Sequence, residues 1–217
     1  MEVTWLGHAC FRLRSDNLVV LTDPFPAEVG LRPDSRPATV VTVSNSHPNH
    51  SNWQEVAGEP RIVSMPGEYQ ASGVSIRGIM TPLAAGTPQT QRNVAYVITI
   101  DGVNICHLGD INMPLTTRQV DELVPVDVLL LPVGGGCTLD MDRLFEVMQN
   151  LDPKLVIPMH YNTPSVKVQL QGLEPFLRRM GTDEAQQPQP RLSVTANTVP
   201  SDMKVVVLAP QARASAG

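Results

Sequence analysis

The sequence is poor in two kinds of residue, and each shortage argues against a class of protein. Only three of its 217 residues are cysteines, at positions 10, 106 and 137, too few and too apolar in context for a disulfide framework. Lysine and arginine together number 16, and Arg178-Arg179 is their only adjacent pair. We therefore expect reduced thiols and no nucleic-acid partner.

The sequence also has no long apolar run. No stretch approaches the roughly 20 residues that cross a bilayer as a helix. Met1-Glu2-Val3 carries an acid where a secretory leader would carry basic residues. These features predict a soluble, cytoplasmic protein without a membrane partner.

The remaining composition is that of a globular protein. Hydrophobic residues make up 42% of the chain and charged residues 17%, with a net charge of −5. We find no internal repeat and no linker, so we expect a single domain over residues 1–217 with a mobile tail from about residue 211. The oligomeric state is open, and a homo-oligomer is compatible with the sequence.

The first half of the chain is rich in short apolar runs typical of strands. Asp101-Gly102 between two of these runs is a strong hairpin signal. The expected strands are Val3–Leu6, Cys10–Arg14, Leu18–Thr22, Thr39–Val43, Val74–Ile79, Val94–Ile100 and Val103–His107.

The second half alternates helices and strands. Thr116 and Gln119 form a capping box that opens a short helix, and Gly181 is the residue type that typically ends a helix, here a later one. Helices are expected before Pro125, over Met141–Leu151 and over Glu174–Met180, and strands over Val128–Leu131, Leu155–Ile157 and Met203–Leu208. Strands first and alternation second predict two facing mixed sheets with helices outside.

Histidines mark the ends of several expected strands, where α/β enzymes place their chemistry. The five histidines are His8, His47, His50, His107 and His160. Asp110 also lies just past a strand, beside a glycine that permits a sharp turn. Histidine and aspartate at separate strand ends predict a metal site, although Asp110 could be an ordinary turn residue and His160 a hydrogen-bonded core residue.

Six short motifs follow one another along the chain. They are T-W-L-G-H-A-C-F near the start, L-T-D-P-F at Leu21–Phe25, M-P-G-E-Y at Met65–Tyr69, H-L-G-D at His107–Asp110, L-P-V-G-G at Leu131–Gly135 and I-P-M-H-Y at Ile157–Tyr161. Taken together in this order, they resemble the metallo-β-lactamase-fold superfamily. The resemblance is strongest to a branch of small metal-dependent hydrolases that contains ascorbate-6-phosphate lactonase-like proteins. It implies an αββα sandwich with the active site at one edge, between the sheets.

The resemblance also shows that family ligands are missing. The family motif H-x-H-x-D-H reads Asn45-Ser46-His47-Pro48-Asn49-His50 here, and Leu83 stands where a further loop histidine is usual. We call Asn45, His47 and Leu83 the first metal position, which keeps only His47. The second metal position keeps His50, Asp110 and His160, with Asn49 in place of the acid.

These losses limit the number of metal ions that the chain is expected to bind. Asp110 is the only ligand-position carboxylate left, so two divalent metals are not expected. Three protein ligands plus water are a normal catalytic zinc set, so His50, Asp110 and His160 could hold one zinc or another divalent transition metal. The sequence thus predicts at most one metal, and no metal is also compatible with it.

Three further residues have candidate roles. Asp23 could orient a ligand histidine or be a turn acid. His8 and His107 could serve as acid–base or substrate-binding groups, since Asn49 cannot handle protons, or could be structural. Together with Asp110, these two histidines are the candidate catalytic residues.

Two functions remain open. The first is a hydrolase that acts on an ester, a lactone or a phosphodiester of a small-molecule substrate through a metal-bound water. The second is a non-catalytic family member whose degraded metal site serves binding or assembly. Fold alone does not choose among these chemistries.

Overall fold

The structure is a computed structural model, and it describes residues 1–82, 84, 92–182 and 187–215. Two mixed β-sheets face one another, as the sequence predicts. The first sheet has the order β12-β1-β2-β3-β4-β5. Its strands are β1 (Glu2–Gly7), β2 (Cys10–Ser15), β3 (Leu18–Thr22), β4 (Val40–Thr42), β5 (Arg61–Val63) and β12 (Leu192–Ser193).

The second sheet has the order β13-β11-β10-β9-β8-β7-β6. Strands β9, β10, β11 and β13 run parallel to one another. Strands β6, β7, β8 and β9 form an antiparallel meander at the opposite side of this sheet. The strands are β6 (Gly67–Ala71), β7 (Val74–Met80), β8 (Val94–Ile100), β9 (Val103–His107), β10 (Val128–Pro132), β11 (Leu155–Met159) and β13 (Lys204–Val205).

The space between the sheets is filled by one hydrophobic cluster drawn from both of them. Trp5 stacks against Phe11 there, and every residue of β10 and β11 is buried. Burial of one such Val or Leu side chain contributes about 1.5–3 kcal/mol. The continuous apolar runs in these two strands therefore follow from cover on both faces.

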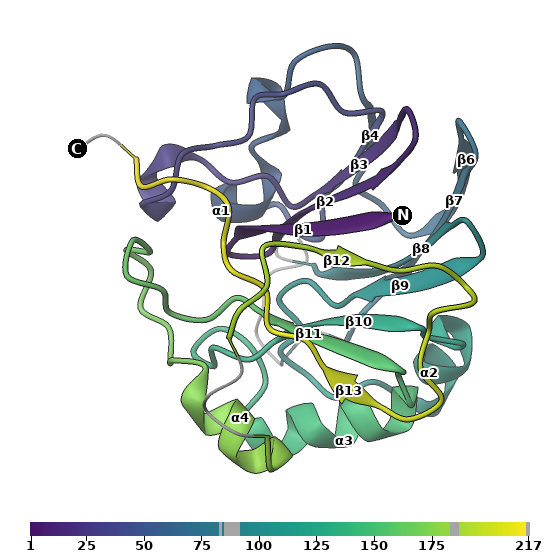
Figure 1. The fold of residues 1–217 in the computed structure, drawn as a ribbon, viewed down its shortest axis with the longest axis vertical. Helices are drawn as coiled ribbons and strands as arrows, with labels where there is room; N and C mark the ends of the chain where they lie inside the picture. Colours follow the sequence, from purple (N-terminus) through teal and green to yellow (C-terminus); the bar gives the residue numbers. More distant parts are fainter. Residues whose placement is uncertain (83, 85–91, 183–186, 216–217) are drawn as a thin grey trace.

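Helices cover the second sheet on its outer side. The segments α2 (Thr117–Leu123), α3 (Met141–Leu151) and α4 (Glu174–Met180) lie there, and α3 and α4 run beneath β10, β11 and β13 in Figure 1. The predicted capping box of Thr116 and Gln119 opens α2, and Gly181 ends α4 in the left-handed conformation.

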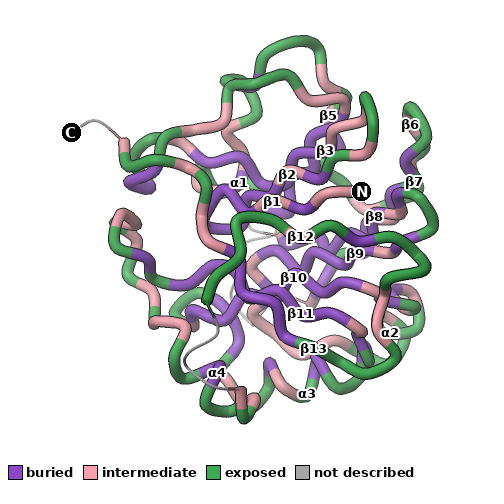
Figure 2. The backbone as a smooth tube through the Cα atoms, viewed as in Figure 1, coloured by how far each residue is buried: buried purple, intermediate pink, exposed green. Residues whose placement is uncertain are grey.

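The outer side of the first sheet has much less helix among the described residues. A second hydrophobic cluster lies there, under the one-turn helix α1 (Pro48–Ser51), the 3₁₀ turns η1 (Ala27–Val29) and η2 (Trp53–Glu55), and irregular chain. Figure 2 shows exposed, half-buried and buried stretches alternating in this part of the chain. The expected outer helical layer is thus uneven: three helices on one side and short turns on the other.

Several strand predictions need correction. β5, β6 and β12 were not predicted, because they are short or mostly exposed edge strands with little apolar signal. The strand expected over Met203–Leu208 is only Lys204–Val205, with an isolated bridge at Leu208.

The chain from residue 211 is tied to the first sheet, which its small polar residues did not indicate. Gln211 N–H donates to Trp5 O at 2.9 Å, and Ala212 N–H donates to Leu6 O at 3.1 Å. Ser215 N–H donates to Gly30 O at 3.0 Å. This segment therefore supports the end of β1, next to the loop that carries His8. No helix within the described ranges is long and apolar enough to cross a membrane.

Candidate metal centre

Five polar side chains from separate strand ends gather at one edge of the two sheets. His8 follows β1, Asp23 follows β3, His50 lies in α1 after β4, Asp110 follows β9 and His160 follows β11. Three of them have positive φ angles, 50° at His8, 39° at Asp23 and 53° at His160. Left-handed backbone is rare for such residues and tends to gather at functional sites.

Asp110 stands between two histidines. Its Oδ2 lies 2.9 Å from His50 Nε2, and its Oδ1 lies 3.2 Å from His160 Nε2. Its side chain is 19% exposed, whereas both histidines are 1% exposed. The structure therefore brings together the three ligands predicted at the second metal position, with the carboxylate at their open side.

The backbone before Asp110 is shaped by Gly109. Its φ is +59°, and a Cβ atom there would lie 2.3 Å from Asn93 Oδ1. That same amide oxygen accepts the Asp110 N–H at 2.9 Å. Only glycine fits this close turn, and the turn fixes the backbone position of Asp110.

Asp23 orients His50 from behind. The fully buried carboxylate of Asp23 lies 2.8 Å from His50 Nδ1 and accepts the backbone N–H of Ser44 at 2.7 Å. A hydrogen bond from Nδ1–H to Asp23 leaves Nε2 of His50 directed at Asp110. Carboxylate–histidine pairs of this kind hold metal ligands in proteins.

His8 is buried beside the same two histidines. Its ring centroid lies 4.2 Å from that of His160 and 4.9 Å from that of His50. One nitrogen from each of these three rings lies within 4.8 Å of the others. Neither nitrogen of His8 has a hydrogen-bond partner, and Nδ1 of His160 has none either. Buried polar atoms are rarely left this way.

The electrostatics of the cluster follow from burial and from Asp110. Burial lowers the pKa of His50, but Asp110 and Asp23 outweigh it and raise that pKa to about 10. Burial and the neighbouring histidines lower the pKa of His8, and burial lowers that of His160. The histidines hold the pKa of Asp110 well below its usual range against the opposing effect of burial. An ionised carboxylate thus faces two neutral imidazoles and one cationic imidazole.

His107 makes contacts different from those expected of a catalytic group. Its Nε2–H donates to Ala9 O at 2.8 Å, and its Nδ1 accepts the N–H of Gly109 at 3.1 Å. Both nitrogens of this fully buried ring are therefore engaged with backbone. The ring links the second sheet to the loop after β1 and leaves no free nitrogen for a proton or a metal.

The first metal position has few donors. His47 is exposed, caps α1 and accepts the Asn49 N–H on its Nδ1 at 3.2 Å. Buried Asn45 uses its side-chain oxygen to accept the His47 N–H at 3.0 Å. Leu83 lies outside the described residues. His47 approaches the other site only at a ring-centroid distance of 6.5 Å from His50.

Sequence reasoning missed one neighbour of the site. The exposed thiol of Cys137, in the glycine-rich loop after β10, lies with Asp110 and His160 within 4.8 Å, counting one ligand atom from each residue. Partial burial of the sulfur and the charge of Asp110 raise the pKa of Cys137 to about 12. The only sequence signal was its place after a strand at the same edge.

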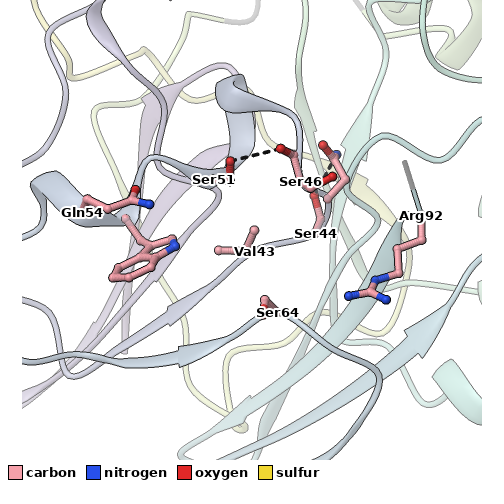
Figure 3. Close-up of a pocket in the computed structure, with 9 residues that line it drawn as sticks. Val43, Ser44, Ser46, Ser51, Gln54, Ser64 and Arg92 are labelled. Carbon is pink, nitrogen blue, oxygen red and sulfur yellow. Dashed lines mark hydrogen bonds between the residues drawn. The ribbon is translucent and has the colours of Figure 1, made fainter. Parts of the chain in front are cut away.

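A polar cavity of about 570 Å³ adjoins the first metal position. Ser44 and Asn45 line it, and Ser44 also donates its backbone N–H to Asp23. Figure 3 shows the Arg92 side chain on the opposite side of this space from Ser51 and Gln54. The lining residues are Val43, Ser44, Asn45, Ser46, Ser51, Trp53, Gln54, Ser64 and Arg92.

The donors of the second metal position suit one divalent metal. The unpartnered nitrogens of His8 and His160 have no protein hydrogen bond to lose, and Asp110 supplies a negative charge. Imidazole nitrogen and carboxylate oxygen are the donors of many zinc sites. Within the described residues, the first position offers no comparable set.

Comparison with known proteins identifies relatives of this chain. A protein of Methanoculleus marisnigri named UPF0173 metal-dependent hydrolase is 33% identical over 205 residues, covering 82% of this chain and 88% of its own length. A relative of the same name from Carboxydothermus hydrogenoformans is 27% identical over 197 residues, covering 75% of this chain and 85% of its own.

Solved structures also match this chain. A Thermotoga maritima protein of the metallo-β-lactamase superfamily matches with a TM-score of 0.78 and 35% identity, covering 95% of this chain and 97% of its own. A metallo hydrolase from Ignicoccus hospitalis shares the fold, with a TM-score of 0.63 at 19% identity, 89% of this chain and 99% of its own being covered. The family model described as the β-lactamase superfamily domain matches residues 2–160. The chain therefore belongs to the metallo-β-lactamase superfamily.

Proposed function

We propose that this chain is a hydrolase that uses a single divalent metal, zinc by donor type, to cleave an ester, lactone or phosphodiester. The observation that carries the proposal is the placement of His50 Nε2 and His160 Nε2 on the two oxygens of Asp110, with Asp23 behind His50. The names of the relatives, metal-dependent hydrolases, support the reaction class.

His50, Asp110 and His160 would hold the metal. A metal bound there would supply Lewis acidity, lowering the pKa of water and polarising a carbonyl or phosphoryl oxygen. The low pKa of Asp110 keeps its carboxylate ionised at neutral pH, so it acts as an anionic ligand and hydrogen-bond acceptor rather than as a general acid.

The cavity beside Asn45 is the proposed place for the substrate. Arg92 is the one formally charged residue among its described lining residues, and Trp53 adds an aromatic face that is 39% exposed. A small molecule with an anionic group and an apolar part would suit this lining. This supports a phosphodiester or an acidic ester over a neutral one.

The alternative function is a binding protein without catalysis. It is favoured by the asparagines at positions 45 and 49, which remove a histidine and an acid from the family ligand set. Such a protein would keep the fold and the cavity but would take up no metal of its own. Metal content therefore separates the two functions.

The test joins metal content to activity. The purified chain is loaded with zinc, desalted and analysed for metal, and then assayed with p-nitrophenyl acetate, a simple lactone and bis-p-nitrophenyl phosphate. The proposal expects about one zinc per chain, and hydrolysis of one substrate class that Asp110→Asn abolishes. A chain that retains no zinc and cleaves none of the three would support the binding protein instead.

A further inference from the structure

The second metal position has a neighbour to which the family ligand pattern gives no role, the imidazole of His8. Neither ring nitrogen of His8 has a hydrogen-bond partner, whereas His47, His50 and His107 each use at least one. His160 has an ion-pair contact of 3.2 Å from its Nε2 to Asp110, and among the described residues His8 has no such contact with a carboxylate. Its side chain is 1% exposed. A structural histidine buried this deeply would be expected to have a partner on at least one nitrogen.

The backbone holds His8 against His160. The carbonyl oxygen of His8 accepts the N–H of His160 at 2.9 Å and the indole N–H of Trp5 at 3.0 Å. These bonds fix His8 in its left-handed conformation at the end of β1. The backbone of His8 is therefore held beside that of His160, and its buried ring lies 4.2 Å, centroid to centroid, from the His160 ring.

The unpartnered nitrogens of His8 lie near the imidazoles of His50 and His160. Asp23 holds Nδ1 of His50, so the other nitrogen of that ring is the one available to the cluster. One nitrogen from each of His8, His50 and His160 then lies within 4.8 Å of the others. Three imidazoles share one small volume, and none of the hydrogen bonds found among the described residues joins two of them. Such a group is a donor set that suits a divalent metal.

We infer that His8 is a metal ligand, which takes the place in the donor set that Asn49 leaves vacant. The inference rests on the proposed function, because it concerns the same metal. The resulting set has three imidazoles, from His8, His50 and His160, and one carboxylate, from Asp110. Such a nitrogen-rich set favours zinc, cobalt, nickel or copper over magnesium, calcium or manganese.

The position of Asn49 is consistent with this replacement. Its backbone N–H is used by His47, and its side chain is a neutral amide, a poorer zinc donor than a carboxylate. The neutral imidazole of His8 brings the number of protein ligands back to four without adding charge. The site keeps a single negative charge from Asp110, which suits one divalent ion rather than two.

The first test counts imidazoles in the wild-type chain. Cobalt is loaded in place of zinc, and paramagnetically shifted imidazole N–H resonances are counted by proton NMR. The inference expects three such resonances, and two would overturn it. Because no variant is needed, this measurement does not depend on whether a mutant folds.

The second test measures zinc affinity by competition with a chromophoric chelator. His8→Gln is expected to weaken binding by more than about 100-fold, beyond the 10–100-fold loss typical of residues that only orient a ligand. His47→Gln, at an exposed histidine outside the proposed ligand set, is the matched control and should bind as the wild type does. Far-UV circular dichroism checks that each variant is folded.

The outcomes separate the two proposals. Unchanged zinc affinity in a folded His8→Gln variant, together with one zinc in the wild type, overturns the role of His8 and leaves the hydrolase proposal standing. A wild-type chain that binds neither zinc nor cobalt overturns both. Adding Asn49→Asp to His8→Gln should restore part of the affinity, because it returns an acid to the ligand set.

Discussion

The two metal positions of the family differ in where their donors come from. At the second position, His8, His50, Asp110 and His160 follow four different strands, and each is placed by the geometry of its own strand end. The described part of the first position is one stretch of loop after β4, in which Asn45 and His47 hydrogen bond to each other. The donors of the second position are thus placed by both sheets, whereas the described residues of the first position bond within their own loop.

The second position also has buried groups that hold its ligands from behind. Asp23 is bound by the backbone and side chain of Ser44 and in turn holds His50. Gly109 and Asn93 fix the backbone position of Asp110. These contacts explain why the two positions should respond differently to mutation.

The largest effect is expected from Asp110→Asn. This change removes the carboxylate that contacts both His50 and His160, so zinc affinity should fall by well over about 100-fold and any hydrolase activity should be lost with it. Elemental analysis after desalting and a chelator competition measure the loss. An Asp110→Asn chain that still holds one zinc would show that the second position is not centred on this residue.

Asp23→Asn should have a smaller effect, because Asp23 acts through His50. A loss of about 10–100-fold in zinc affinity is expected. Asp16→Asn is the matched control: Asp16 also has a positive φ, 48°, but is exposed and far from the histidines in the fold. Equal affinities in both variants would argue that Asp23 is only a turn residue.

A pH effect should follow from the pKa of His50, which is raised to about 10 in the metal-free chain. A raised pKa stabilises the folded state fully below the unfolded value of about 6.5, and this stabilisation is lost as pH rises through 10. The thermal midpoint of the metal-free chain should therefore decline over this range.

Zinc binding should show the same ionisation. Because the ligand nitrogen must be deprotonated, binding near pH 7.5 should release about one proton from His50. Calorimetry in buffers of different ionisation enthalpy measures this number. Zero proton release, with a thermal midpoint independent of pH from 7 to 10, would contradict the cationic state of His50.

The smallest effect is expected at the first position. His47→Gln should change zinc affinity and activity by less than about twofold, since one exposed ligand alone does not hold the metal. Chelator competition measures the affinity. A tenfold loss would mean that His47 reaches the bound metal and that the two positions are not independent.

Much of the sheet architecture could be predicted from local sequence. The Asp101-Gly102 turn joins β8 to β9, and the unbroken apolar runs at Val128 and Leu155 become β10 and β11. Such signals are strong because both faces of these strands are covered. The exposed edge strand β6 has no comparable pattern, since its side chains alternate between exposed and half-buried states without a buried face.

The site was predictable as a set of strand ends but not in its detail. His50, Asp110 and His160 come together because parallel strands end at one edge. The state of His107 depends on Ala9, 98 residues away, and sequence alone cannot reveal such a contact. The unpartnered nitrogens of His8 and the nearby thiol of Cys137 likewise appear only once the sheets are placed face to face.

The most direct test of the account is the number of zinc ions held by the unmutated chain after loading and desalting. One zinc per chain, lost in Asp110→Asn and retained in His47→Gln, is the predicted result. The triple change Asn45→His, Asn49→Asp and Leu83→His should then raise the content toward two. Two zinc ions in the unmutated chain would contradict the account, because the first position would be binding metal despite the loss of its family ligands.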